Sequence, residues 1–155
     1  GGEADAAASR LADVRSAVVD AFGPRWPRYA GGRHQDAAVV FALPPFQDES
    51  LPGAEAAWRL STIGMTRPAG GLAPGQNWSE PDYSWTPQTL LYALTAATLG
   101  ERDAAEARLD WVAEHATATG SVPEKVDPDG GGAQVAPLVW SSALVVLTAD
   151  ALRRN

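Results

Sequence analysis

Residues 86–119 read TPQTLLYALTAATLGERDAAEARLDWVAEHATAT and pass from an uncharged segment to a highly charged one across a single glycine. Thr86-Pro87 is an N-cap followed by proline at the first helical position, and Gly100 is typical of the position after a helix end. Residues 90–99 carry no charge, so a helix there must be buried on most of its sides. The stretch therefore predicts an α-hairpin with one inner and one outer helix.

The same alternation extends in both directions along the chain. Segments at about 3–22 and 52–63 have charged outer faces, whereas those at about 36–43 and 137–153 are almost entirely apolar. Periodicity alone does not separate a helix from a strand in the short segment 36–43, which Asp36 can cap. Six segments of this kind predict an all-α fold of three outer/inner hairpins in two layers.

The links that lead into the inner helices are long, and all three must lie at one end of such an array. They span 23–35, 64–85 and 120–136 and gather aromatic, amide, arginine and carboxylate side chains. This mixture suits a sugar, because aromatic rings stack on its faces while planar polar groups bind its hydroxyls. The alternative is that tryptophans anchor ordinary polar loops. The candidate sugar-pocket walls are Trp78, Tyr83, Trp85 and Trp140, with Arg67 as a candidate hydroxyl ligand.

Composition excludes several classes of protein. The chain has 155 residues, 45% of them hydrophobic, and a net charge of −7, which argues against nucleic acid or an anionic membrane as a partner. There is no cysteine, and no apolar run approaches the ~18 residues of a membrane span. The first twenty residues do not resemble a signal peptide, so we expect a cytoplasmic protein. Because the chain starts Gly1-Gly2, its natural start is expected upstream.

No cofactor or metal motif is found. His34 and His115 lie far apart without a third ligand, which disfavours zinc. Residues 127–130 read DPDG, but the twelfth position of a calcium loop would be Leu138, so we expect a turn. Nucleophile-elbow, P-loop and dinucleotide-binding motifs are absent. We expect neither a metal nor a cofactor.

Three stretches together are similar to the C-terminal part of glycoside hydrolase family 15, which contains the glucoamylases and glucodextranases. They are WTPQTLL at 85–91, GSVPEKV at 120–126 and APLVWS at 136–141. The segment from Asp36 to Phe46 resembles an earlier element of the bacterial members. The Pro-Glu loop followed by Pro-Leu-x-Trp-Ser is the most specific part of this likeness.

The resemblance implies half of an (α/α)₆ toroid, with residues 1–155 as a single helical domain from its C-terminal portion. It also implies that Glu124 is the general base for inverting hydrolysis of an α-glucosidic bond, while Lys125 departs from the glutamine usual at that position. Inversion requires a second carboxylic acid roughly 6.5–9.5 Å away, and the family's general acid lies in the missing half. The isolated chain is therefore expected to be inactive.

Other interpretations remain open at this stage. The chain could be a non-catalytic helical module that binds a carbohydrate or a protein, or a helical scaffold that only dimerises. The expected partners are an α-glucoside substrate and either the missing N-terminal half of the barrel or a second copy. The residues leave open the glucan linkage and chain length, and trehalose or another disaccharide stays a candidate substrate.

Overall fold

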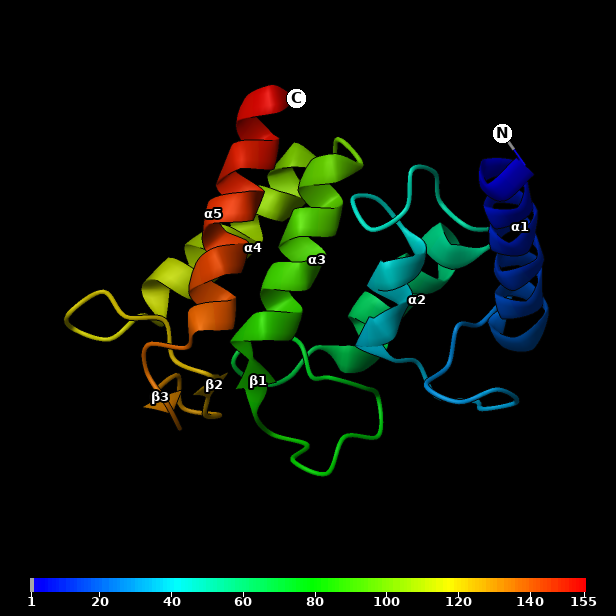
Figure 1. Cartoon of the computed structure of the whole chain (residues 1–155). Helices are drawn as coiled ribbons and strands as arrows, with labels where there is room; N and C mark the ends of the chain where they lie inside the picture. The colour runs from blue at the N-terminus through cyan, green and yellow to red at the C-terminus, as the bar shows by residue number, and fades with distance from the viewer. Residues whose placement is uncertain (1) are drawn as a thin grey trace.

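The computed structural model describes residues 2–155 as a helical array with one small sheet (Figure 1). Its elements, in chain order, are α1 (Gly2–Phe22), η1 (Ala37–Ala42), α2 (Ala54–Met65), β1 (Ser84–Trp85), α3 (Thr86–Thr98), α4 (Arg102–Glu114), β2 (Lys125–Val126), β3 (Gly132–Ala133) and α5 (Val139–Arg154). The six helical segments confirm the predicted all-α fold class and its outer/inner alternation. No helix among residues 2–155 is both long enough and apolar enough to cross a bilayer.

The uncharged helix α3 forms the centre of the array. It packs against α4, α5 and η1, and most of its side chains are buried. Leu91 and Leu94 are buried as predicted. Buried Tyr92 reaches α2, where its hydroxyl lies 2.6 Å from Ser61 Oγ. Its neighbour α4 keeps charged residues on the solvent side, and Asp103, Glu106 and Asp110 are exposed as predicted.

The second predicted helix is a six-residue 3₁₀-helix, η1, rather than an α-helix. Asp36 caps it as expected, since its Oδ1 accepts a hydrogen bond of 3.0 Å from the backbone N–H of Ala38. Helix α2 packs against η1 and buries Trp58. A 3₁₀ geometry is common in such short pieces, because six residues make too few hydrogen bonds to favour an α-helix.

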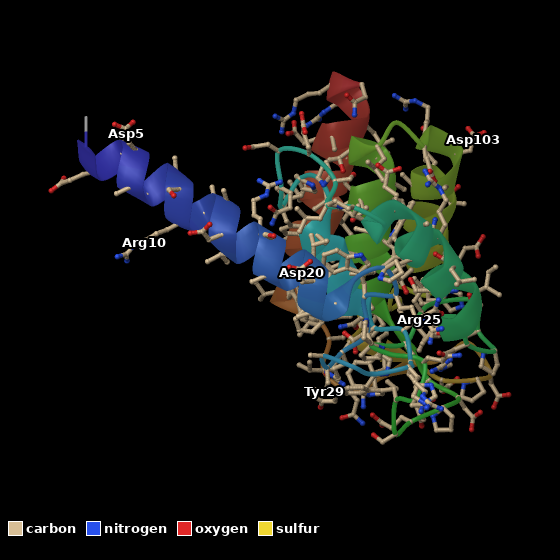
Figure 2. All side chains as sticks on the ribbon, turned by 90° about the vertical axis from the view of Figure 1, so that its right-hand side faces the viewer. Asp5, Arg10, Asp20, Arg25, Tyr29 and Asp103 are labelled. Carbon is tan, nitrogen blue, oxygen red and sulfur yellow. The ribbon has the colours of Figure 1, made fainter. Side chains whose placement is uncertain are left out.

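Helices α1 and α5 at the two ends of the array leave apolar side chains in solvent. Figure 2 shows α1 extending away from the other helices, and its apolar residue Leu11 is 58% exposed. The expectation that α5 is buried on most sides is wrong. Leu144 is buried and Val145 partly so, but Val146 is 66% exposed on the opposite face. In a half-toroid, these faces have no neighbouring helix to cover them.

Several helix boundaries differ from the sequence prediction. Helix α2 spans Ala54–Met65 where 52–63 was expected, and α5 begins at Val139 instead of residue 137. Helix α4 ends at Glu114 instead of near Thr119, and the N-cap of α3 is Trp85 instead of Thr86. Thr86 is already helical, and its hydroxyl bonds to residues of other elements. Gly100 follows α3 with φ of +78°, a left-handed conformation that glycine adopts without strain.

Candidate functional site

The three long links lie together at the end of the array opposite the two chain termini, as predicted (Figure 1). A three-stranded antiparallel sheet, β1–β2–β3, joins the second link to the third. In this sheet Trp85 pairs with Lys125, and Lys125 pairs with Ala133. The second link is also held to the first, where Asp36 forms a bridge with Gly75. The loops are therefore fixed to one another as well as to the helices.

Glu124, the predicted base, is held at the N-terminal ends of two inner helices. Its carbonyl oxygen accepts a hydrogen bond of 3.1 Å from the N–H of Thr86, the first residue of α3. The Thr86 hydroxyl donates to the Pro123 carbonyl at 2.6 Å and lies 2.7 Å from Ser141 Oγ in the first turn of α5. The Glu124 N–H donates to Val135 O at 2.9 Å. The main chain around Glu124 is therefore fixed on both sides, and its side chain is half-buried.

Lys125, the next residue, makes the closest ionic contact between the second and third links. Its Nζ donates to both carboxylate oxygens of Glu80, at 2.7 and 2.8 Å. The same Nζ lies 4.1 Å from the ring centroid of Trp85 and 5.8 Å from that of Tyr83. A cation over an aromatic face is attracted by its quadrupole. Lys125 thus contacts two of the predicted wall residues, Tyr83 and Trp85, next to the loop that carries Glu124.

A second aromatic contact extends the site toward the first link. Trp78 and Trp85 meet edge to face, with ring centroids 5.9 Å apart. Arg28 lies on Trp78, with Cζ 4.7 Å from the ring centroid, and its Nε is 3.5 Å from Asp36 Oδ2. The structure therefore brings Trp78, Trp85 and Tyr83 into one cluster around Lys125 and Arg28.

Arg67 donates hydrogen bonds to the backbone of the second link. Its Nη2 donates to the carbonyl oxygens of Gly75 and Gln76, at 3.0 and 3.3 Å. Desolvation by partial burial lowers the pKa of this guanidinium, and the negative charge of Asp82 works in the opposite direction. These contacts fix the second link near Trp78, and a role as a hydroxyl ligand stays a prediction.

Trp140 occupies the first turn of α5, close in sequence to Ser141, and its side chain is 48% exposed. No aromatic contact joins it to the other predicted walls within the part of the chain that the structure describes. It lies at the correct end of the array but outside the cluster around Lys125.

Sequence reasoning singled out neither Arg28 nor Glu80 as site residues. Both are isolated charges in polar links, and their partners Asp36 and Lys125 lie eight and 45 residues further along the chain. No spacing rule relates residues so far apart in loops.

Within residues 2–155, no group of three or more His, Asp or Glu side chains lies close enough together to hold a metal ion. The DPDG segment forms the expected turn. Asp127 O accepts from the N–H of Gly130 at 3.1 Å, and Asp127 Oδ1 accepts from the N–H of Gly131 at 2.8 Å. The Asp127 carboxylate is thus used to close its own turn.

The fold is similar to that of solved glycosidases. One is a wild-type glycosidase, with a TM-score of 0.80 and 21% identity over 96% of this chain. Another is a variant with a glutamate replaced by alanine, in complex with glucose, with a TM-score of 0.79 and 20% identity over 96% of this chain. The chain spans 44% of the length of each of these glycosidases. At this level of identity, the likeness establishes a shared fold.

No protein-family model matches the sequence, and no curated protein matches it either.

Proposed function

We propose that this chain is the C-terminal part of an inverting glycoside hydrolase that acts on α-glucosides, similar to members of glycoside hydrolase family 15. Glu124 is the general base that activates water, and the general acid is supplied by the remainder of the toroid. The observation that carries this proposal is the hydrogen bond from the N–H of Thr86, the first residue of α3, to the Glu124 carbonyl, with the Thr86 hydroxyl in turn beside Ser141 in the first turn of α5.

Catalytic geometry requires a base that stays in place while water attacks. The Glu124 carbonyl and N–H are both bonded, and Lys125 beside it is held by Glu80. A main chain fixed in this way limits the conformational entropy that is lost when substrate binds, which is the advantage of a preorganised site. Glu124 is only partly buried, so the residue is not sealed from solvent.

The surrounding side chains suit a sugar. Trp78 and Trp85 provide aromatic faces and edges, and Tyr83 lies close to the same lysine. Such surfaces stack against the C–H groups of a pyranose ring and leave its hydroxyls to polar neighbours. The similar fold of a glycosidase solved with glucose supports a glucoside as the substrate.

An assay of product stereochemistry tests this function. A protein containing this chain and the rest of its toroid is incubated with α-linked glucosides, and the newly formed anomer is followed by proton NMR. We expect β-glucose to appear first, because water attacks the face opposite the leaving group. First appearance of α-glucose would contradict inversion. Sugar binding without hydrolysis would favour a non-catalytic carbohydrate-binding module.

A further inference from the structure

A groove lined mainly by apolar side chains lies between α1 and η1, at one end of the array. Its volume is about 410 Å³, and we call it the α1–η1 groove. Its walls include Leu11, Val14, Val18 and Phe22 of α1, with Val39 and Phe41 of η1. Leu11 and Val14 are 58% and 59% exposed, and Phe41 is 49% exposed. The groove therefore presents apolar surface to solvent.

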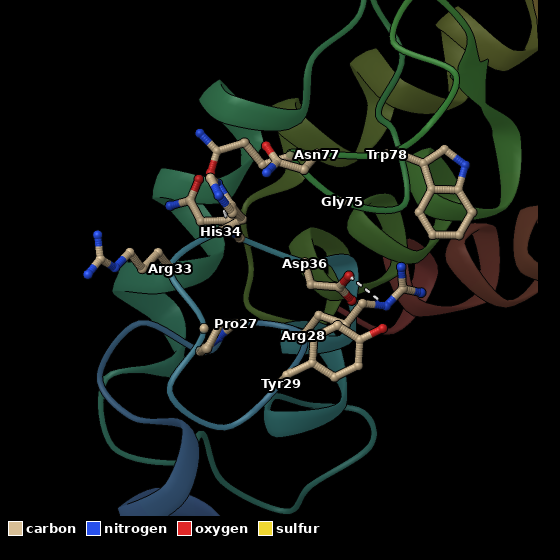
Figure 3. A pocket seen from close by; sticks show the side chains of 12 residues that line it. Pro27, Arg28, Tyr29, Arg33, His34, Asp36, Gly75, Asn77 and Trp78 are labelled. Carbon is tan, nitrogen blue, oxygen red and sulfur yellow. Dashed lines mark hydrogen bonds and ion pairs between the residues drawn. The ribbon is translucent and has the colours of Figure 1, made fainter.

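The polar groups of this groove indicate what kind of occupant fits it. Trp26 lines the groove and is buried, and its indole N–H has no hydrogen-bond acceptor among residues 2–155. Arg28 is also in the lining, but Asp36 and the ring of Trp78 hold its guanidinium (Figure 3). Arg15 is the other cation of the lining, and it forms no ion pair within the described part of the chain. A fitting occupant is therefore apolar and carries an acceptor and a negative charge.

Helix α5, at the opposite end of the array, exposes a surface with these properties (Figure 1). Its exposed apolar residues recur at helical spacing and form what we call the α5 stripe: Val139, Ala143, Val146 and Leu147. Asp150 lies one turn beyond Val146 and Leu147 and continues this stripe. Its partners Arg153 and Arg154 belong to the same helix and are 75% and 73% exposed, so these ion pairs are weak. The carboxylate of Asp150 is thus able to pair with another cation.

The length of the chain and the placement of its ends favour a second copy as the occupant. The chain spans 44% of the length of the similar glycosidases, so two copies match most of the length of one such protein. Helix α1 begins and α5 ends at the same end of the array (Figure 1). A two-fold axis along the array therefore places the α5 stripe of each copy beside the α1–η1 groove of the other. The same axis keeps the long links of both copies at one end.

The size of the contact requires both of these surfaces. Helix α5 has 16 residues. A helix of this length is about 24 Å long and about 10 Å wide, so one stripe in one groove buries about 500 Å² over both partners. Specific interfaces bury more than about 1,000 Å². A single contact of this kind is therefore too small, whereas the two equivalent contacts of a two-fold dimer reach the necessary area.

We propose that two copies of this chain associate about a two-fold axis, with the α5 stripe of each copy seated in the α1–η1 groove of the other. The apolar residues of the stripe cover Leu11, Val14 and Phe41, and Asp150 supplies the negative charge that complements Arg15. The inference rests on the fold and does not require the proposed function.

Sedimentation velocity on the 155-residue chain tests which surfaces associate. The wild type should sediment as a dimer. Val14→Glu in the groove and Val146→Glu on the stripe should each raise the dimer dissociation constant at least about tenfold, because each substitution enters both contacts. The matched control is Ile63→Glu, at a residue of α2 that is 78% exposed and lies outside both surfaces. It should leave the constant unchanged. All three side chains are exposed within one copy, so the fold tolerates these changes.

Cross-linking tests which surface meets which. The chain contains no cysteine, so Val14→Cys and Val146→Cys each introduce a single thiol. A bismaleimide added to a mixture of the two variants should join residue 14 of one copy to residue 146 of the other, which mass spectrometry of the digested product detects. Each variant alone should give little cross-linked dimer, because like positions lie in different contacts of the two-fold dimer.

The other outcomes overturn the inference. Cross-links between the two copies of residue 146, with Val14→Glu still dimeric, indicate that α5 pairs with α5. Loss of association in Ile63→Glu places the interface on α2. A wild type that remains a compact monomer at high concentration leaves both surfaces to the rest of the toroid or to a different protein. Each of these results leaves the proposed function standing, because the experiments measure neither hydrolysis nor sugar binding.

Discussion

The ammonium of Lys125 donates to both carboxylate oxygens of Glu80, at 2.7 and 2.8 Å, across 45 residues of sequence. The two side chains differ in environment, because that of Lys125 is 9% exposed and that of Glu80 is 39% exposed. The nearly buried partner therefore depends on the more exposed one for its charge compensation. This ion pair holds the second link against the loop that carries Glu124.

The ion pair of Lys125 and Glu80 predicts that single and double variants differ in stability in an asymmetric way. Glu80→Ala leaves a nearly buried ammonium without its carboxylate and should lower the free energy of unfolding by about 2 kcal/mol. Adding Lys125→Met removes that charge as well, so the double variant should be more stable than Glu80→Ala alone. Urea unfolding of the single and double variants measures both values. Equal stability of the two variants would contradict a desolvated ammonium.

A matched control lies on the surface of α4. Arg102 and Glu106 form an ion pair of 2.9 Å in which both side chains are 50% exposed. Glu106→Gln should change the unfolding free energy by less than about 0.5 kcal/mol, because solvent screens exposed pairs. A cost as large as that of Glu80→Ala would show that ion pairs in general, and not burial, set the effect.

The helical part of the fold follows from the sequence because charge alternation reports burial directly. The uncharged run ending in Gly100 became α3, and the charged stretch after it became α4, with Asp103 and Glu106 in solvent. The outermost helices were less predictable. Apolar residues such as Leu11 on α1 form a helix face that a neighbour could cover, but no pattern in the sequence shows whether that neighbour is present.

The site was predictable in its location and only partly in its contacts. Because the three long links were expected at one end of the array, Glu124, Trp78 and Trp85 were expected in the same region. The two-residue strands that pair Trp85 with Lys125 have no periodicity to detect, since alternation needs at least four residues. Salt bridges between loops depend on the folded backbone, so the partnership of Lys125 with Glu80 emerges only from the structure.

Buried Tyr92 makes stability sensitive to alkaline pH. Burial raises the pKa of its phenol, although the hydrogen bond with Ser61 acts in the opposite direction. The neutral form is thus favoured in the folded state. The contribution of Tyr92 to the free energy of unfolding is complete below the ordinary tyrosine pKa of about 10. It is lost as pH rises further, because the phenol ionises more readily in the unfolded chain. Urea midpoints should fall above about pH 10.

Tyr92→Phe tests this dependence. The variant should lose about 1 kcal/mol near neutral pH, since Ser61 Oγ loses a partner at 2.6 Å. Its stability should then decline less steeply above pH 10 than that of the wild type. Tyr29→Phe, at an exposed tyrosine, should leave the slope unchanged. If the stability of the wild type and of Tyr92→Phe fell equally steeply above about pH 10, the alkaline sensitivity would not arise from Tyr92.

The uncovered face of α5 predicts self-association of the isolated chain. Val139, Val146 and Leu147 are exposed there, and burial of apolar surface yields about 25 cal/mol per Å². Sedimentation velocity should detect a dimer, the commonest closed assembly. Val146→Glu should shift the population toward monomer. A compact wild-type monomer at high concentration would be the contrary result.

The central claim, that Glu124 is the general base, is tested most directly by steady-state kinetics of Glu124→Gln. The comparison uses a protein containing this chain and the rest of its toroid, with an α-glucoside as substrate. The account predicts that kcat falls by roughly 10²–10⁴, the usual contribution of general base catalysis, while KM changes little because the amide keeps the shape of the side chain. An undiminished kcat in Glu124→Gln, or full turnover by the isolated 155-residue chain, would contradict it.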